Sequence, residues 1–409
     1  MRILVVSNFF PPHYVGGYEI ACSEAVKGLK DRGHEVVVLT STYGVGRRET
    51  AAGVCRWLRP DIRWHQQPSG QLRSVASTLK QEMVNQRALR SLVRAFAPDI
   101  VYLWNLAVIS VSMAFLTQEL GIPLAFQVSD FSLLSWKDDA WYSLMSSRPN
   151  RAVVRLVQRL VRIGARRFGL IVPADHIKLG HVHFLSGFLQ RALLDKGLRA
   201  TNPRVIHWGV DARRYQYRSE PSERTRILYA GQIVPHKGVQ TVVEALKILG
   251  EAQGGELVTL TLAGGSVLPE YESKIRQMVS FLGLSRRVQF LGHVPREELP
   301  EVYAKHDIFV FPSVWDEPFG IALLEAMASG LAVVATASGG SAEILKDGTN
   351  ALIFPKEDAS ACAERITSLM MDPDLFNRIR RAARRTVEQG FRLDAAVEST
   401  ECALRDAIG

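Results

Sequence analysis

The sequence predicts an α/β protein of two doubly wound domains, each a parallel sheet with helices on both faces. Short apolar runs recur along the 409 residues, as expected of strands that are covered on both sides. Helical patterns separate these runs, so successive strands should lie parallel. A polar stretch with two prolines, from Thr201 to Glu223, divides the runs into two series. We therefore predict domains at about 1–205 and 206–390 that face each other across a cleft, followed by a helical tail at 391–409.

The first series opens with a predicted strand at 3–7, a loop rich in proline and glycine, and a helix to about Asp31. A strand at 36–39 completes a βαβ unit. The remaining predicted strands are 99–103, 123–127 and 170–173 in the first series, and 226–230, 259–263, 288–291, 308–311 and 332–335 in the second. Because open sheets of this kind bind ligands at the carboxyl ends of their strands, functional residues are expected in the loops that follow strands.

The composition is that of an ordinary globular protein, with 47% apolar and 22% charged residues. The four cysteines are scattered without a C-x-x-C pair, which argues against a disulfide framework or structural zinc and is typical of a reducing compartment. The pair His181 and His183 lacks a third ligand, so no metal site is expected there. The chain opens without a signal-peptide pattern and has no apolar run of about 20 residues, so we expect a cytoplasmic protein.

Positive charge is concentrated in the first half of the chain. The net charge is +9, but residues 1–215 hold 29 basic and 15 acidic residues, net +14, which leaves −5 for the rest. This asymmetry favours an anionic partner for the first half. We expect no nucleic acid, because no recognised nucleic-acid motif is present. Peripheral contact with the anionic inner face of the plasma membrane is the alternative that we retain.

A predicted helix at 151–167 has a basic side and an apolar side. Five arginines share an arc of about 80°: Arg151, Arg155, Arg159, Arg162 and Arg166. Such a helix can lie on an anionic membrane, or it can pack its apolar side into the core and leave the arginines in water. We favour the packed arrangement.

The most informative motif follows the predicted strand that ends at Phe311. Glu317 lies in the loop before a helix, whereas Glu325 lies within that helix among apolar residues, where a carboxylate needs a partner or a ligand. An anion such as phosphate would be attracted to the backbone N–H groups at the helix start, those of Phe319, Gly320 and Ile321. On spacing alone, one N-terminal and one solvated glutamate explain the pattern equally well.

Other loops after strands repeat this chemistry. Lys237 and Gly238 open a helix, and a lysine there is unfavourable for the helix dipole unless an anion binds beside it. A solvated lysine is the alternative interpretation. Paired glycines, which let backbone N–H groups approach a ligand or simply make a tight turn, occur at Gly16-Gly17, Gly264-Gly265 and Gly339-Gly340.

Together these motifs resemble the retaining glycosyltransferases of family 4, which have the GT-B fold of two Rossmann-like domains. The resemblance is carried by Glu317-Pro318-Phe319-Gly320 with Glu325, by Lys237-Gly238, and by Gly339-Gly340 with Glu343. It spans nearly the whole chain. It implies a hexosyltransferase-type enzyme that moves a sugar from a nucleotide-sugar to a saccharide or lipid-linked glycan, in cell-surface polysaccharide or glycoconjugate biosynthesis. It also implies that the tail at 391–409 crosses back onto the first domain.

The resemblance assigns a role to each matching residue. Glu317 would contact hydroxyl groups of the donor sugar, and Glu325 would bind the ribose. Lys237 would neutralise the leaving diphosphate, and Val294 would contact the base through its backbone. Backbone groups near the phosphates and the sugar would come from Gly16, Gly17, Phe319, Gly320 and Ile321. The family generally uses no side-chain-bound metal and no cofactor, so the nucleotide-sugar, a UDP- or GDP-sugar, is a substrate.

Two positions depart from the family pattern. Gln232 stands where the family usually has an arginine, and glutamine can donate a hydrogen bond but carries no charge. Ser129-Asp130 stands where a His-Asp pair is common; Asp130 is kept as a catalytic-site residue that contacts the acceptor or the donor sugar. Aromatic residues after Asp130 either line an acceptor groove or fold back on the core: Phe131, Trp136, Trp141 and Tyr142.

Two other functions remain open. A non-catalytic subunit that binds nucleotide-sugars is conceivable because of Gln232. A nucleotide-sugar epimerase of the same fold is the second, and the presence of both Glu317 and Glu325 argues against it.

Overall fold

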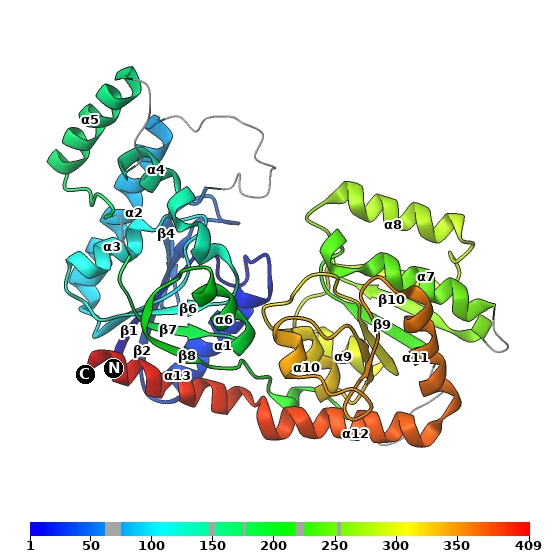
Figure 1. The fold of residues 1–409 in the computed structure, drawn as a ribbon. Helices are drawn as coiled ribbons and strands as arrows, with labels where there is room; N and C mark the ends of the chain where they lie inside the picture. The colour runs from blue at the N-terminus through cyan, green and yellow to red at the C-terminus, as the bar shows by residue number, and fades with distance from the viewer. Residues whose placement is uncertain (62–74, 147–151, 175–176, 218–224, 252–254) are drawn as a thin grey trace. The chain divides into compact units, whose positions relative to one another are not determined.

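The computed structural model describes residues 1–61, 75–146, 152–174, 177–217, 225–251 and 255–409. These residues form two compact units (Figure 1). The first unit comprises Met1–Ile206 together with Val397–Gly409, and the second comprises His207–Ala396. Each unit has a mainly parallel sheet flanked by helices, so the predicted two-domain α/β fold is confirmed.

In its described residues the first unit has an eight-stranded sheet in the order β3-β4-β2-β1-β5-β6-β7-β8. The strands are β1 Arg2–Ser7, β2 Glu35–Ser41, β3 Glu49–Ala51, β4 Val54–Leu58, β5 Ile100–Asn105, β6 Leu124–Val128, β7 Leu179–Phe184 and β8 Ala200–Val205. The helices are α1 Gly17–Asp31, α2 Val75–Phe96, α3 Ser112–Glu119, α4 Ala140–Ser146, α5 Ala152–Arg167 and α6 Gly187–Asp195. All neighbouring strands are parallel apart from the β3–β4 pair.

Two sequence predictions for this unit are wrong. Residues 170–173 form no strand; Leu170 is buried because it packs in a small cluster with Trp141 rather than pairing with the sheet. The strand that takes this place is β7, whose alternating Leu-Gly-His-Val-His-Phe sequence lacks a continuous apolar run. The expected linker is also partly a strand, because β8 pairs with β7 from Leu179 onward. The end of that linker, residues 218–223, lies outside the described residues.

The second unit has a sheet of six strands in the described residues, ordered β11-β10-β9-β12-β13-β14. The strands are β9 Arg226–Ala230, β10 Thr259–Ala263, β11 Val288–Gly292, β12 Ile308–Phe311, β13 Ala332–Ala335 and β14 Leu352–Ile353. Five of them were predicted. The helices are α7 Val239–Gly250, α8 Pro269–Phe281, α9 Leu299–Ala304, α10 Ile321–Ala328, α11 Ala359–Met371 and α12 Pro373–Gly390.

The last helix, α13 (Leu393–Ile408), packs on the first unit from Val397 onward. Val397 lies so close to Gly28 of α1 that a side chain at Gly28 would overlap it. Glu401 accepts a hydrogen bond from Arg32 at 3.3 Å and lies 3.0 Å from Nε2 of His34. An apolar contact with α1 and polar contacts with the residues that follow it therefore fix this part of α13 on the first unit.

Within the described ranges, no helix combines the length and the apolar character needed to span a bilayer. The hydrophobic core of each unit is centred on its sheet, where apolar side chains of the central strands are fully buried. Examples are Val5 and Val101 in the first unit and Leu228 and Val310 in the second.

Candidate functional site

The sheet order of the second unit places its functional loops. The chain builds outward from β9 to β10 and β11, and then returns to add β12 on the other side of β9. The connection after β9 leads to one side of the sheet and the connection after β12 leads to the other. Two neighbouring strands of this kind leave a crevice at their carboxyl ends, where ligands bind in open α/β sheets. The loop after β9 carries Lys237 and the loop after β12 carries Glu317. The two predicted residues therefore meet at this crevice.

Lys237 and Glu317 form a close ion pair. The Nζ of Lys237 lies 2.8 Å from Oε1 and 2.9 Å from Oε2 of Glu317. The hydroxyl of Ser313 donates to the same Oε1 at 2.6 Å. Glu317 is buried, whereas Lys237 is partly exposed and lies over the Trp315 ring, 5.5 Å from its centroid. The ammonium group is thus held at the crevice by Glu317, with 24% of the Lys237 side chain exposed.

The position of Lys237 depends on the residue after it. Lys237 ends a single 3₁₀ turn (Pro235–Lys237), and Gly238 then adopts the left-handed conformation with φ of 70°. A Cβ at Gly238 would overlap the carbonyl oxygen of Pro312. Only glycine lets the two loops approach this closely. Burial and the nearby Lys237 charge lower the pKa of His236, in the same turn, from its usual value.

The first turn of α10 supplies the backbone groups that were predicted. The helix begins at Ile321, and Gly320 precedes it. Its first N–H groups have no acceptor within the helix, so they can bind an anion. The Phe319 side chain is buried and stacks on His207 at 5.8 Å between ring centroids. Its ring is therefore part of the packing, so a role toward a ligand would be left to its backbone.

A third loop closes around the same segment. Gly339 forms a β-bridge with Glu317, and the Gly340 N–H donates to the Glu317 carbonyl at 2.6 Å. Gly339 has φ of 61°, and a Cβ there would overlap that carbonyl oxygen. The glycine pair after β13 thus fixes the Glu317 backbone, a role that the sequence alone left open between ligand approach and a tight turn.

Glu325 is buried and paired rather than solvated. Arg296 Nη1 lies 2.5 Å from its Oε1, and the Tyr303 hydroxyl donates to its Oε2 at 3.1 Å. Burial, with the Glu325 charge adding, raises the pKa of Tyr303 well above its usual value. Sequence reasoning established that Glu325 needed a partner but missed both Arg296 and Tyr303. Neither belongs to a recognisable motif.

The remaining predicted donor-side residues lie in neighbouring loops. Gln232 follows β9, and its carbonyl accepts the Tyr229 hydroxyl at 2.6 Å. Val294 follows β11, two residues before Arg296, and is half-buried. A further pair that sequence reasoning missed joins His207 Nε2 to the Glu343 carboxylate at 2.8 Å.

The first unit has an equivalent crevice between β1 and β5, because β2 lies on one side of β1 and β5 on the other. Asn8, directly after β1, donates to the side chain of Asn105 at 2.7 Å. Asn105 in turn donates to Asp130 Oδ2 at 3.2 Å, and Ser132 N–H donates to Oδ1 at 2.8 Å. Asp130 is therefore held at the carboxyl end of the sheet by the Asn105 side chain at the end of β5 and by the Ser132 N–H.

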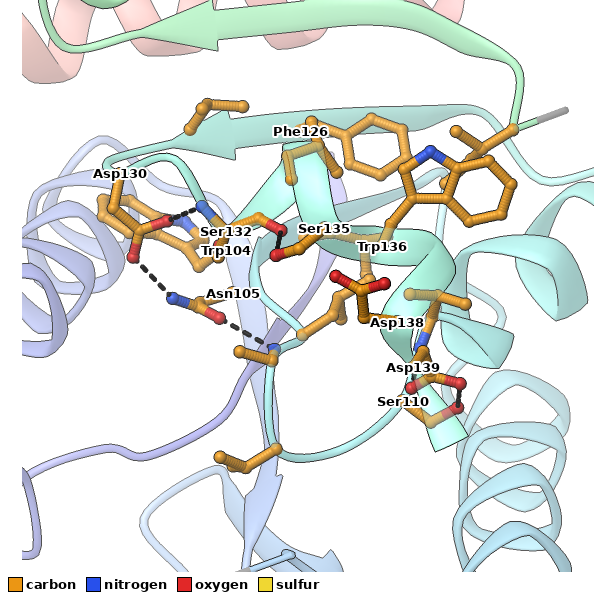
Figure 2. A pocket seen from close by; sticks show the side chains of 18 of the residues that line it. Trp104, Asn105, Ser110, Phe126, Asp130, Ser132, Ser135, Trp136, Asp138 and Asp139 are labelled. Carbon is orange, nitrogen blue, oxygen red and sulfur yellow. Dashed lines mark hydrogen bonds between the residues drawn. The ribbon is translucent and has the colours of Figure 1, made fainter. Parts of the chain in front are cut away.

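Asp130 lies at the rim of a cavity of about 400 Å³ (Figure 2). Trp104 and Asn105 of β5 line it, as does Trp136 of the 3₁₀ segment Ser132–Asp138. Among the described residues that line the cavity, the charged side chains are all aspartates: Asp61, Asp130, Asp138 and Asp139. A neutral or cationic ligand with several hydroxyl groups suits this lining, and an anionic ligand does not.

The aromatic residues after Asp130 divide between the two expected arrangements. Trp136 lines the cavity, and the Tyr142 ring packs edge-on against the Trp136 ring, with 4.8 Å between the ring centroids. Trp141 instead folds back on the core, where it is buried. Phe131 packs against Phe188 at 6.3 Å.

Gly16 and Gly17 begin α1 after the loop that follows β1. Gly16 N–H donates to Glu19 Oε2 at 2.9 Å, so the glycine backbone is positioned by this buried carboxyl. Burial raises the pKa of Glu19 to about 7. Burial also raises the pKa of Tyr18, which lies near Asn8 and Asp130. The first helix turn is therefore linked to the Asp130 network of the same unit.

In the described parts of the chain, no group of three His, Cys, Asp or Glu side chains is arranged to hold a metal ion.

Comparisons with known sequences match both halves of the chain. Residues 215–386 match the family described as glycosyl transferases group 1, and residues 16–209 match the glycosyl transferase 4-like domain. The chain is 28% identical to the glycogen synthase of Mycobacterium tuberculosis over 96% of its own length and 91% of the relative's.

Comparisons with solved structures give the same fold. The sucrose-phosphate synthase of Thermosynechococcus elongatus is similar with a TM-score of 0.73 and 20% identity, over 99% of this chain and 98% of that chain. HepE of Anabaena, in complex with UDP-glucose, is similar with a TM-score of 0.71 and 21% identity, over 99% of this chain and 100% of that chain. The chain that carries Lys237, Glu317 and Glu325 therefore has the same fold as these proteins.

Proposed function

Because the chain belongs to the group 1 glycosyltransferases and has the GT-B fold, we propose that it moves a hexose from a UDP- or GDP-sugar to a saccharide or lipid-linked glycan, with retention of the anomeric configuration. The proposed setting is cell-surface polysaccharide or glycoconjugate synthesis, in the cytoplasm or at the inner face of the plasma membrane. The observation that carries the proposal is the Lys237–Glu317 pair beside the start of α10. It brings a cation, a carboxylate and open N–H groups to one crevice.

These groups suit the two ends of a nucleotide-sugar. Breaking the bond to the anomeric carbon leaves negative charge on the diphosphate, which Lys237 and the first N–H groups of α10 would stabilise. Glu317 would accept hydrogen bonds from the sugar hydroxyls. Glu325, held by Arg296 and Tyr303, would receive the ribose hydroxyls. Gln232 would donate a hydrogen bond to the diphosphate without adding charge.

The proposed chemistry needs no covalent intermediate on the protein. The bond between the anomeric carbon and the diphosphate oxygen breaks while the acceptor oxygen bonds to the same face of the sugar. The acceptor proton passes to the leaving phosphate oxygen. The protein positions both substrates and stabilises the charge that develops, and these tasks contribute most to reactions of this type. We assign no role to a metal or a cofactor.

We further propose that the cavity beside Asp130 receives the acceptor. Its aspartates and its Trp136 ring suit a neutral or amino sugar, since hydroxyl groups hydrogen-bond to carboxylates and sugars stack on aromatic rings. The net charge of +14 in residues 1–215 supports peripheral contact with an anionic membrane, where a lipid-linked acceptor would be found.

The HepE complex supports UDP-glucose as the first donor to test. A thermal-shift screen of the purified chain with UDP-, GDP-, ADP- and TDP-sugars, run beside donor-hydrolysis assays, tests the proposal. A ligand at one hundred times its Kd stabilises the folded state by about 2.7 kcal/mol. We expect a shift with one nucleotide class and slow hydrolysis of that donor.

Lys237→Met should abolish both results, because it removes the cation at the crevice. Lys356→Met is the matched control: Lys356 makes a 2.8 Å ion pair with Asp316 but is more exposed. A shift without hydrolysis or transfer would favour the binding subunit, for which Gln232 is the supporting observation. Absence of any shift would refute the donor site.

A further inference from the structure

The helix α5 turns an apolar stripe to solvent. Leu156, Leu160 and Ile163 follow the i, i+4, i+7 spacing of one helix face, and they are 58%, 60% and 56% exposed. Phe168, just beyond the helix, is 65% exposed. The packed arrangement favoured from the sequence is therefore wrong for this stripe.

The opposite face of α5 is already used for packing. Ala165 is buried in a cluster with Trp141 and Met145 of α4, and Val161 packs against the same cluster. Figure 1 shows α5 at the periphery of its unit, beside α4. The rotation of the helix about its axis is thus fixed by one apolar face, and no cluster of described residues packs against the second apolar face.

Arginines border one side of the exposed stripe and its C-terminal end. Arg155, Arg159, Arg166 and Arg167 are all exposed, and the helix contains no acidic residue. Among the described residues, no carboxylate forms an ion pair with Arg159, Arg166 or Arg167. A large apolar stripe bordered by cations is the pattern of a helix that lies in the headgroup region of an anionic membrane.

We infer that α5 seats the first unit on an anionic lipid bilayer. Leu156, Leu160, Ile163 and Phe168 enter the boundary between headgroups and acyl chains, while the flanking arginines bind lipid phosphates. The stems of the arginines reach around the stripe and leave their charged ends at the headgroups. This inference names the surface through which the proposed function would reach a lipid-linked acceptor, and to that extent it rests on that function.

Charge makes a bilayer a better occupant of this face than a second copy of the chain. Two copies joined through α5 would bring two sets of arginines together without acidic partners on the helix, and like charges at such an interface are unfavourable. An anionic bilayer supplies both the apolar layer and the phosphates.

The cavity beside Asp130 is connected to α5 through α4. Asp139 and Ala140, at the start of α4, line the cavity, and the next residue, Trp141, packs in the cluster with Ala165 of α5. The exposed stripe lies on the face of α5 opposite to the one that packs on α4, so a bilayer bound to it would lie across α5 from α4, and α4 would join the membrane-bound helix to the cavity.

Vesicle sedimentation of the full chain tests the inference. The probes are vesicles of phosphatidylcholine alone and of an equimolar mixture of phosphatidylcholine and phosphatidylglycerol. We expect binding only to the mixture, and weaker binding at about 1 M salt, where charges are screened within about 3 Å. Leu156→Ser with Leu160→Ser should lower the partition coefficient by roughly tenfold or more.

Matched variants separate the two contributions. Phe281→Ser removes an apolar side chain that is more exposed still, on α8 of the other unit, and should change nothing. Arg159→Gln with Arg166→Gln should weaken binding by roughly fivefold for each charge removed. Arg378→Gln with Arg381→Gln removes the same charge from α12 and should have a much smaller effect. Because all these side chains are exposed, thermal unfolding should stay as in the wild type.

Equal binding by the wild type and the leucine variant would overturn the inference, as would equal binding to both kinds of vesicle. So would a dimer in sedimentation equilibrium that the leucine variant dissociates, since the stripe would then belong to a second copy. Donor hydrolysis, measured without vesicles, reports the proposed function separately. Hydrolysis without vesicle binding would defeat only the membrane inference, and vesicle binding without hydrolysis or transfer would defeat only the proposed transfer.

Discussion

Substitution of Arg296 by methionine should destabilise the second unit, because it leaves the Glu325 carboxylate buried without a cation. The Arg296 side chain is only 12% exposed and that of Glu325 only 4%, and their charged atoms lie 2.5 Å apart. Methionine keeps an unbranched apolar stem of comparable reach in place of the arginine stem. The change therefore removes the charge more than the packing.

The magnitude follows from this burial. Removal of one partner from a buried ion pair costs about 3–5 kcal/mol, whereas an exposed pair is worth about 0–1 kcal/mol. The Tyr303 hydroxyl still donates to Glu325 and offsets about 1 kcal/mol. We expect a net loss of about 3 kcal/mol. For a unit of about 150–250 residues this lowers the Tm by roughly 6–12 °C.

Thermal and urea unfolding of the full chain, followed by circular dichroism, measure the effect. Lys247→Met is the control, because Lys247 makes an exposed 3.2 Å pair with Glu251 on α7 and should cost about 0.5 kcal/mol or less. The double variant Arg296→Met with Glu325→Gln leaves no unpaired charge and should recover at least half of the loss.

Two results would refute this reasoning. The first is an Arg296→Met variant that is as stable as Lys247→Met, which would mean that Glu325 is solvated or paired elsewhere. The second is a double variant that is no more stable than Arg296→Met alone, which would mean that lost packing rather than an unpaired carboxylate is responsible.

Three further predictions concern the other loops. Gly339→Ala forces φ of 61° on a residue with a side chain and displaces the Glu317 carbonyl. It should lower the free energy of unfolding by about 1–2 kcal/mol or more and weaken the donor-dependent thermal shift. An unchanged thermal shift would contradict the role of Gly339. Because the pKa of Glu19 is raised from 4.5 to about 7, its contribution to stability is present below pH 4.5 and is lost as the pH rises to about 7. Glu19→Gln should therefore raise the Tm relative to the wild type at pH 8 but not at pH 4. The upper limit of the stabilisation is about 3.4 kcal/mol, and parallel pH profiles of the two proteins would contradict this prediction. Asp130→Asn, which keeps the shape of the side chain, should lower transfer to an acceptor by about 10²-fold and leave donor hydrolysis nearly unchanged, and equal losses of both would place Asp130 on the donor instead.

The strands were predictable where burial on both faces produces a continuous apolar run. β12, with Ile308 to Phe311, and β13, with Ala332 to Ala335, are of this kind. β7 was not predictable, because His183 is fully buried within it. Burial lowers the pKa of His183 to about 3, so the imidazole is neutral and can occupy a core position. Neutralisation by burial is a property of the folded environment, which a hydropathy pattern does not contain.

The candidate site was predictable by residue type and place, but its pairings were not. Lys237 and Glu317 each follow a strand, yet the sequence does not specify that β9 and β12 are neighbours. Arg296 was missed because it lies in a loop without a motif and becomes significant only through Glu325. For α5, the same periodicity suits a helix with either apolar face against the core, and the packing of Ala165 decides between them.

The Lys237–Glu317 pair also affects which anions the crevice can hold. Since a carboxylate of the protein already neutralises the lysine, a small free anion such as inorganic phosphate must compete with a partner that is permanently tethered at 2.8 Å. A nucleotide-sugar has an advantage in this competition, because its sugar hydroxyls can occupy Glu317 while its diphosphate occupies Lys237. We therefore expect the internal ion pair to disfavour simple anions and to favour a ligand that satisfies both of its charges at once.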